Sequence, residues 1–414
     1  MANPMGKNFG NNSRGQEIAS DVQELKDRGL FRTFRVVSGP QGPEIIIDGK
    51  KVLLMCSNDY LGLANHPELR DAALKAIEKY GVGAGSSRLI SGNMELHIML
   101  EERIAAFKGT ESALLFNSGY HANTGIIPAM VGRGDIIFSD ELNHASIIDG
   151  CRLSFAETVV YPHRNMNFLE DALKKSVYRR KLIVTDAVFS MDGDIAPLPE
   201  IIKLGERYNA FVMVDEAHST GVLGERGRGV REFFGIDNDI DILMGTLGKA
   251  LGCFGAYAAV SRQMRDYLTN RARSFIFTTA LPPAICASAI RAMDIIENNP
   301  AIVKRLHKNI ECLSNGLRSV GISYISEQNI PVYPIIIGDA QKTMTICGHL
   351  FDEGVFIQGI RPPTVPEGTS RLRLTVTAGH TGEHISRCLR VVLLAMEKEF
   401  FNGKKINRKV PQGY

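Results

Sequence analysis

Closely spaced cysteines are missing from this sequence. The seven cysteines stand singly along 414 residues, and no two of them form a Cys-x-x-Cys pair. This spacing argues against a zinc site and against a disulfide framework. We therefore expect no bound metal, and we expect reduced thiols in a cytoplasmic enzyme.

Long apolar runs and an excess of one charge are missing too. No stretch reaches the roughly 18 consecutive apolar residues of a membrane-spanning helix, so we expect no membrane span. The first residues, MANPMGKNFGNNSRGQ, have no apolar core, so we expect no secretory signal. The 48 basic and 45 acidic residues leave a net charge of +3, which is too balanced to indicate a nucleic-acid partner.

A phosphate-binding loop of the Gly-x-x-x-x-Gly-Lys-[Ser/Thr] type is also absent. The motif DEAH at residues 215–218 matches the acidic box of a helicase family, which needs such a loop. The nearest candidate, GTLGKAL from Gly245, has the wrong glycine spacing and carries Ala250 in place of the hydroxyl residue. It also follows the DEAH motif instead of preceding it. A helicase is therefore excluded, and Asp215 serves another partner.

The sequence does contain short apolar runs that alternate with helical periodicity. Strand-like runs are ALLFNSG, DIIFSD, KLIVTD, AFVMVD and DILMGT, and helix-like segments between them include FLEDALKKSVYRR and LPEIIKLGERYN. This alternation predicts an α/β fold in which a mostly parallel sheet is covered by helices on both faces. Ligands bind at the carboxyl ends of the strands in such sheets.

The chain divides into four expected parts. Residues 1–55 read as an N-terminal arm with a hairpin at Asp48-Gly49, and residues 56–295 as the large domain. Residues 296–400 read as a smaller α/β domain, with a helix from Ile290 to Leu317 leading into strands VYPIIIG, GVFIQGI and RLRLTVTA. Residues 401–414 form a basic tail that we expect to be disordered.

Two charged residues follow strand-like runs. Asp215 closes the apolar run AFVMVD, where a carboxylate is costly unless a cation accompanies it. Lys249 follows DILMGT by a short turn between Gly248 and Ala250, and a buried lysine readily loses its proton. Each also has a structural alternative: the aspartate as a helix N-cap, the lysine as a solvated surface residue.

Other polar residues follow the remaining strands. Ser118-Gly119-Tyr120 stands at a predicted helix start, which is suited to an anion, while His144 follows DIIFSD. Together with Asp215, Lys249 and His218, these groups match the needs of pyridoxal phosphate. This cofactor requires a lysine for its aldehyde, a carboxylate for its pyridine nitrogen, a phosphate site, a flat group against its ring and hydrogen bonds to its phenolic oxygen.

The motifs VDEAHSTG, MGTLGKALG, SNDYLGL, FNSGY, NHASIIDG and VFSMDGD resemble those of the α-oxoamine synthases. These are fold-type-I pyridoxal-phosphate enzymes that condense an amino acid with an acyl-CoA and release CO₂. The resemblance extends from about residue 20 to residue 395. It implies a fold-type-I transferase with amino-acid and acyl-CoA substrates.

The resemblance also implies roles for individual residues. Lys249 is expected to bind the cofactor aldehyde and to act as the base at the substrate Cα. Asp215 is expected to pair with the pyridine nitrogen, and His144 to stack on the ring. The other implied cofactor contacts are Ser190 and His218 at the phenolic oxygen, Ser118, Gly119 and Tyr120 around the cofactor, and Thr246 near its phosphate.

Two further threonines bear on assembly. Thr278 and Thr279, in FTTALPP, match a loop that reaches the phosphate of the neighbouring subunit, which implies a homodimer with shared active sites. For the substrate carboxylate an arginine is needed, because its planar fork binds both oxygens at once. Arg373 in RLRLTVTA is the first candidate and Arg361 in GIRPPTVP is the second.

Within the family, the segments GIRPPTVPEGTSRLRLTVTA and GSSRLISGN most resemble the branch that joins L-alanine to a pimeloyl thioester in biotin synthesis. That branch implies substrate contacts for Asn58, Thr364 and Arg32, and a basic residue suits an acyl chain that ends in a carboxylate. Other segments resemble the branches that use serine with palmitoyl-CoA or glycine with acetyl-CoA. Asp186 stands where the family often has glutamate.

Two other classes of protein stay as alternatives. A transaminase would share the fold and the cofactor but would not need CoA. A non-catalytic subunit of the same fold would be expected to lack the lysine, and Lys249 is present.

Overall fold

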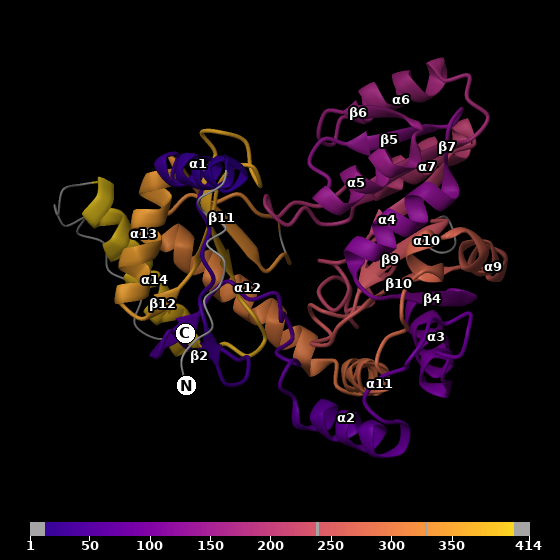
Figure 1. Cartoon of the computed structure of the whole chain (residues 1–414). Coiled ribbons are helices and arrows are strands. Elements are labelled where there is room, and N and C mark those ends of the chain that lie inside the picture. Colours follow the sequence, from indigo (N-terminus) through magenta and orange to yellow (C-terminus); the bar gives the residue numbers. More distant parts are fainter. Residues whose placement is uncertain (1–12, 237–239, 328, 401–414) are drawn as a thin grey trace.

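The computed structural model describes residues 13–236, 240–327 and 329–400, and Figure 1 shows two parts side by side. The larger part is built on a seven-stranded sheet. In spatial order its strands are β4 (Ser112–Phe116), β10 (Ala256–Val260), β9 (Ile242–Thr246), β8 (Phe211–Asp215), β7 (Lys181–Asp186), β5 (Ile136–Asp140) and β6 (Glu157–Tyr161). Strand β10 is antiparallel to both neighbours, and the others run parallel, which confirms the predicted mostly parallel sheet.

Helices cover this sheet, so its central strands are buried along their length. In β8 every residue after Phe211 is buried, and in β7 every residue after Lys181. A strand covered on both faces carries a continuous apolar run instead of an alternating one, as both sequences do. The helices of this part are α2 (Pro67–Tyr80), α3 (Glu95–Lys108), α4 (Gly119–Met130), α5 (Ala145–Ser154), α6 (Met166–Lys175), α7 (Leu198–Tyr208), α8 (Val230–Phe234), α9 (Arg262–Arg271), α10 (Arg273–Ile276) and α11 (Pro283–Asn298).

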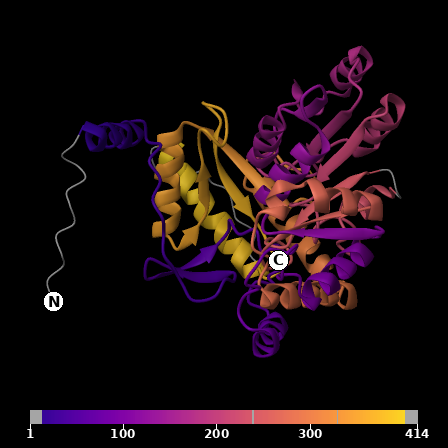
Figure 2. The same cartoon turned by 45° about the vertical axis from the view of Figure 1, so that its right-hand side comes forward.

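The smaller part contains two sheets. One has the order β11 (Val332–Gly338), β14 (Ser370–Thr375), β13 (Gln358–Ile360), and the other has the order β1 (Val37–Ser38), β2 (Glu44–Ile47), β3 (Lys50–Leu54), β12 (Val355–Phe356). Its helices are α12 (Ala301–Ser319), α13 (Ala340–Asp352) and α14 (Gly382–Phe400), while α1 (Ser13–Asp27) extends away from the sheets in Figure 2.

The N-terminal hairpin belongs spatially to the C-terminal part. Ile47 pairs with Lys50 across a turn in which Asp48 and Gly49 both have positive φ, which confirms the predicted hairpin. Strand β3 then pairs in parallel with β12, from the other end of the chain. We retain the four-part division of the chain, with its boundary at residue 296, as a proposal; the tail at 401–414 lies outside the described residues.

Three details differ from the sequence prediction. The helix expected from Ile290 to Leu317 is two helices, because Pro300 interrupts the pattern between α11 and α12. The expected strand GVFIQGI is divided between two sheets, with β12 against β3 and β13 against β14. Strands β6 and β10 were not predicted; the edge strand β6 is largely exposed, and its periodicity is therefore weak.

Candidate active site

Asp215 lies at the carboxyl end of β8 and is only 4% exposed. Its Oδ2 accepts a hydrogen bond from Asn123 Nδ2 at 2.9 Å, and its Oδ1 accepts one from the backbone N of Ala217 at 2.9 Å. The amide and the backbone N–H fix the carboxylate by its two oxygens, and both are neutral donors. The negative charge therefore remains available to a cationic group placed beside it.

A second carboxyl group lies at the end of the adjacent strand. Asp186 of β7 stands directly opposite Asp215 in the parallel register, and its Oδ2 accepts a hydrogen bond from the backbone N of His144 at 2.6 Å. Burial raises the pKa of Asp186 well above its usual range, and the charge of Asp215 raises it further. The two strand ends thus form an acidic floor for the site.

Lys249 follows β9 and faces this acidic floor. Its Nζ lies 2.7 Å from Nε2 of His218. Burial lowers the pKa of Lys249 to about 8, although the charges of Asp215 and Asp186 act in the opposite direction. With this pKa about a tenth of the lysine is a neutral amine at pH 7, on the order of a hundred times more than at the ordinary pKa, and a neutral amine is the nucleophilic form.

Arg373 of β14 reaches across from the smaller part and completes a polar chain with His218. Nδ1 of His218 lies 2.7 Å from the Tyr60 hydroxyl, and that hydroxyl accepts a hydrogen bond from Arg373 NH2 at 3.4 Å. The guanidinium also donates to Asn58 Oδ1 at 3.1 Å and to the backbone O of Ser190 at 2.8 Å. Burial lowers the pKa of His218 well below its ordinary value, so the imidazole is neutral.

His144 is the N-cap of α5 and belongs to the same group of residues. Its Nδ1 lies 2.7 Å from Ser146 Oγ, which accepts a hydrogen bond from Asn123 Nδ2 at 2.9 Å. Asn123 therefore links His144 to Asp215. The residue as a whole is exposed, while partial desolvation of its ring lowers its pKa against the opposing charge of Asp215.

The start of α4 offers an anion site. Ser118 is the N-cap of this helix, and its side chain accepts a hydrogen bond from the backbone N of His121 at 3.2 Å. A Cβ on Gly119 would lie 2.8 Å from Thr246 Cγ2, so the helix start closely approaches the end of β9. Thr246 Oγ1 is buried and has no hydrogen-bond partner in the part of the chain that the structure describes. A buried hydroxyl without a partner beside a helix N-terminus fits a phosphate group.

The two threonines of the FTTALPP loop lie at this same end. Asn117 Nδ2 donates to Thr278 Oγ1 and to the backbone O of Thr279, both at 2.9 Å. Tyr120 is half exposed and donates to Asp149 Oδ2 at 2.7 Å.

Arg32, Arg361 and Thr364 form a separate group. Arg361 donates to the backbone carbonyls of Gly29 and Phe31, the latter at 2.7 Å, and Arg32 donates to the carbonyl of Pro362 at 3.3 Å. Within the described residues these bonds run between the N-terminal arm and the loop that carries exposed Thr364. They do not run to the residues around Lys249. The structure thus brings Arg373 to the lysine, while Arg361 fixes the arm.

The sequence alone assigned no role in this site to four of the residues that build it: Tyr60, Asn123, Ser146 and Asp186. Two carried a usable signal, because Tyr60 stands two residues after Asn58 in SNDYLGL and Asp186 ends a strand in the same way as Asp215. Asn123 and Ser146 lie inside helices, and only their spatial neighbours reveal them.

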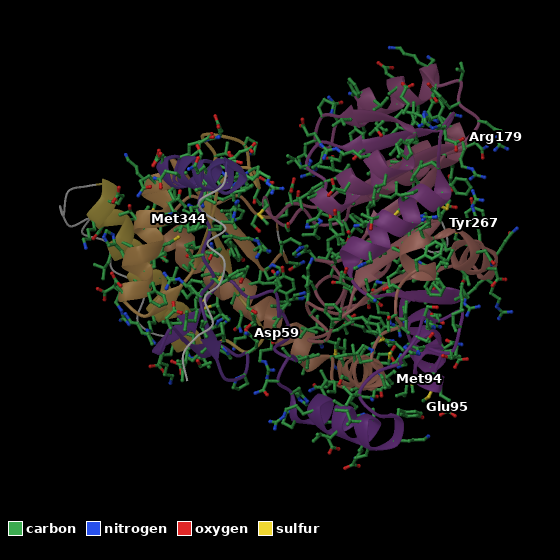
Figure 3. All side chains as sticks on the ribbon, in the orientation of Figure 1. Asp59, Met94, Glu95, Arg179, Tyr267 and Met344 are labelled. Atoms are coloured by element: carbon green, nitrogen blue, oxygen red, sulfur yellow. The ribbon has the colours of Figure 1, made fainter. Side chains whose placement is uncertain are left out.

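Figure 3 labels two residues that lie in different places relative to the two parts of the molecule, Asp59 and Arg179. Asp59, the sequence neighbour of Asn58, lies between the smaller part and the larger part, whereas Arg179 lies at the outer edge of the larger part. Among the described residues no group of three His, Cys, Asp or Glu side chains is arranged to hold a metal ion. No helix in the described ranges is long and apolar enough to cross a membrane.

Comparison with known proteins agrees with this geometry. The family model for class I and II aminotransferases matches residues 50–392. The chain belongs to this family. An 8-amino-7-oxononanoate synthase from Geobacter sulfurreducens is 53% identical over 377 residues, covering 90% of this chain and 96% of the relative. Another with the same name, from Thermoanaerobacter pseudethanolicus, is 50% identical and covers 94% and 97%.

Solved structures resemble this aminotransferase-family chain over most of its length. A serine palmitoyltransferase from S. paucimobilis that holds PLP and myriocin has a TM-score of 0.88 at 31% identity, covering 95% of this chain and 99% of that one. An 8-amino-7-oxononanoate synthase from Francisella tularensis has a TM-score of 0.73 at 30% identity, covering 84% and 99%.

Pyridoxal 5'-phosphate is the cofactor of this family member, which is a PLP-dependent enzyme of the acyltransferase type. The residues present fit it: Lys249 has an amine whose pKa is lowered to about 8, Asp215 has a fixed carboxylate, and the Thr246 hydroxyl, which has no partner among the described residues, lies beside the start of α4. The predicted cofactor and fold class are thereby confirmed.

Proposed function

We propose that this enzyme is an 8-amino-7-oxononanoate synthase. It condenses L-alanine with a pimeloyl thioester, carried on CoA or on a carrier protein, and releases CO₂ and the thiol in biotin synthesis. The observation that carries the proposal is the 50–53% identity to synthases of this name, over 90% or more of this chain. Serine palmitoyltransferase, the alternative favoured by the fold, is only 31% identical. Glycine C-acetyltransferase is the other alternative.

The proposed residue roles follow from the contacts. The amine of Lys249 would hold the cofactor aldehyde in the resting enzyme; once the substrate amine has replaced it there, the freed lysine would remove the proton from the substrate Cα and later return one. Asp215 holds a proton on the pyridine nitrogen through its fixed carboxylate, and His144 lies against the ring. When bound, pyridoxal phosphate supplies the electron sink for negative charge at Cα.

The phosphate and the phenolic oxygen have their own proposed partners. The N–H groups at Ser118, Gly119 and Tyr120 and the Thr246 hydroxyl bind the phosphate, because that hydroxyl lacks another partner among the described residues. His218 and Ser190 contact the phenolic oxygen, since His218 already reaches Lys249.

Arg373 is the proposed partner of the substrate carboxylate. A guanidinium carries five N–H donors, and three of those on Arg373 go to Ser190, Asn58 and Tyr60. The hydrogen bonds fix its plane and leave N–H groups for a carboxylate, with Asn58 beside it. Arg361 is committed to two backbone carbonyls of the arm and is the weaker candidate for this role.

Arg32 and Arg361 suit the far end of a pimeloyl chain. Burial lowers the pKa of Arg361, and the positive charge of Arg32 lowers it further. The two cations therefore lie near each other. Neither has a salt bridge to a carboxylate within the described residues. The terminal carboxylate of the acyl chain is the proposed partner of this pair, with Thr364 at the same loop.

A homodimer is proposed as the working form. Thr278 and Thr279 lie at the phosphate end, and the adjoining surface is apolar: Phe277 is 70% exposed and Ile90 is 81% exposed. Their segments meet through a hydrogen bond from the Ala280 N to the Ser86 O at 2.9 Å. A second copy covering this surface places the two threonines beside its phosphate site. Analytical ultracentrifugation tests this, and a monomer at micromolar concentration would contradict it.

A cytoplasmic location is also proposed, because all seven cysteines are free. The activity is tested by titrating the PLP-loaded protein separately with L-alanine, glycine and L-serine while recording its visible absorbance. We expect a saturable change with L-alanine alone. Pimeloyl-CoA should then give CoA, CO₂ and 8-amino-7-oxononanoate by mass spectrometry. A response to serine or glycine alone would replace the proposed substrate and leave the family unchanged.

A further inference from the structure

The segment that leaves β8 after Asp215 is held by a buried ion pair that the proposed chemistry does not use. Residues 216–230 carry His218 and lead to α8. Glu216, at the start of the segment, and Lys108, the last residue of α3, have fully buried side chains. Nζ of Lys108 lies 2.5 Å from Oε2 of Glu216.

Glu216 joins the two ends of this segment. Its Oε1 accepts a hydrogen bond from the backbone N of Val230 at 2.8 Å and one from Ser219 Oγ at 3.4 Å. Its own backbone N donates to the carbonyl of Met244 in β9 at 2.6 Å. The glutamate therefore fixes the turn directly after Asp215 to the start of α8 and to the neighbouring strand.

Lys108 holds the same segment from the helix side. Its Nζ donates to the backbone O of Arg228 and, at 3.5 Å, to Thr220 Oγ1. The Thr220 hydroxyl lies 3.0 Å from the Tyr257 hydroxyl of β10. Gly229 leaves room for the pair, since a Cβ there would collide with Glu216 Oε1 and lie 2.8 Å from Lys108 Nζ.

Residues 216–230, held in this way, contact the turn that carries Lys249. Gly221 has a φ of +78°, and a Cβ on it would lie 2.5 Å from the Cβ of Ala250, the residue after Lys249. A shift of the segment by a fraction of an ångström therefore reaches His218 and Lys249 together. Stability alone does not require an ion pair here, because well-packed neutral residues of similar volume often replace a buried pair without loss.

We propose that Lys108 and Glu216 are positioning residues that fix the turn carrying Asp215 and His218 at the cofactor site. The inference rests on the cofactor roles proposed above for those two residues. The inference is tested by measuring the affinity for pyridoxal phosphate, which does not depend on the acyl substrate. A chain that binds the cofactor but does not condense L-alanine with a pimeloyl thioester would overturn the proposed function and leave this inference intact.

The double variant Lys108→Met with Glu216→Gln tests the proposal on the full chain. It removes both charges together, and the side-chain amide oxygen at position 216 can still accept the hydrogen bond from Val230. We expect the unfolding temperature of the apo protein to stay near the wild-type value. The Kd for PLP should rise roughly tenfold or more, because displacements of about 1 Å already have effects of that size at active sites. Hydrogen exchange of the amides at residues 216–220 should become faster.

The matched control is Arg103→Met on the same helix. Arg103 donates to Asp294 at 2.9 Å and to Glu297 at 2.6 Å. Glu297 also accepts a hydrogen bond from Arg228 NH2 at 3.0 Å, and the control variant leaves that bond and the Lys108–Glu216 pair in place. This variant should lower the unfolding temperature and leave the Kd for PLP unchanged, which separates stability from positioning. A double variant with wild-type cofactor affinity and wild-type amide protection would overturn the proposal.

Glu216→Gln alone is the second variant, in case the double variant does not fold. It keeps the shape of the side chain and the Val230 hydrogen bond, and burial already lowers the pKa of Lys108 towards a neutral amine that fits beside an amide. We expect an increase of severalfold in the Kd for PLP. An unchanged Kd together with unchanged exchange at residues 216–220 would also refute the positioning role.

Discussion

The protonation of Lys249 gives the sharpest quantitative prediction. Burial lowers its pKa from 10.5 to about 8. This difference corresponds to about 3.4 kcal/mol against the charged amine, and the residue is partly buried, so solvent screening reduces this figure only in part. At pH 7.5 roughly a quarter of the molecules then carry a neutral amine, compared with roughly one in a thousand at the ordinary pKa.

Competitive acetylation of the apo protein measures this pKa at the single residue. Acetic anhydride reacts only with neutral amines, and peptide mass spectrometry reports the extent of labelling at each lysine as the pH is varied. We expect a midpoint near 8 for Lys249. Lys75 is the internal control, because its hydrogen bond to Asp71 raises its pKa above 10.5.

The variant Asp215→Asn tests the cause of the Lys249 pKa. The carboxylate of Asp215 opposes the effect of burial and raises the pKa of Lys249, so its removal should move the labelling midpoint below 8. A wild-type midpoint above 10, or a midpoint that rises in Asp215→Asn, would refute the electrostatic reasoning.

The remaining predictions concern a histidine and a glycine. Burial alone lowers the pKa of His163, but hydrogen bonds to Asp140 and Asp194 outweigh it and raise the pKa to about 9. The imidazolium therefore stabilises the fold fully below about pH 6.5, and its contribution is lost as the pH rises through about 9. The free energy of urea unfolding should fall between about pH 6.5 and pH 9 in the wild type and not in His163→Gln. Parallel profiles of unfolding free energy against pH for the two proteins would contradict this prediction. In Gly119→Ala the new Cβ lies 2.8 Å from Thr246 Cγ2, so we expect roughly tenfold weaker PLP binding. Adding Thr246→Ser removes that methyl carbon and should restore part of the affinity, whereas a wild-type Kd in Gly119→Ala would show that the backbone yields.

The residues at strand ends were the most predictable part of the site. Asp215 and Lys249 follow buried apolar runs, and parallel strands bring their carboxyl ends to one edge, so their proximity follows from the pattern. The start of α4 at Ser118 was equally predictable from the sequence, because a serine followed by a glycine precedes a helical segment.

Other features depend on packing between distant segments, which a single sequence does not contain. Arg373 reaches the site because its Nε donates to the backbone O of Ser190, in the segment after β7, whereas Arg361 donates to backbone carbonyls of the N-terminal arm. Asn123 supports Asp215 from one turn inside α4, where an asparagine has no characteristic spacing. The division of GVFIQGI between two sheets is likewise a tertiary effect.

The pairing of β3 with β12 has a consequence for synthesis on the ribosome. Residues 50–54 emerge early, yet the parallel partner of their outer edge is at residues 355–356. With about 300 intervening residues and elongation at roughly 5–20 residues per second, that edge waits about 15–60 s for its partner. During this interval β3 exposes unpaired backbone groups and the apolar side chains of Val52 to Leu54, which are buried in the finished chain. A chaperone, or a second nascent chain, thus has tens of seconds to act on the nascent hairpin before β12 covers its edge.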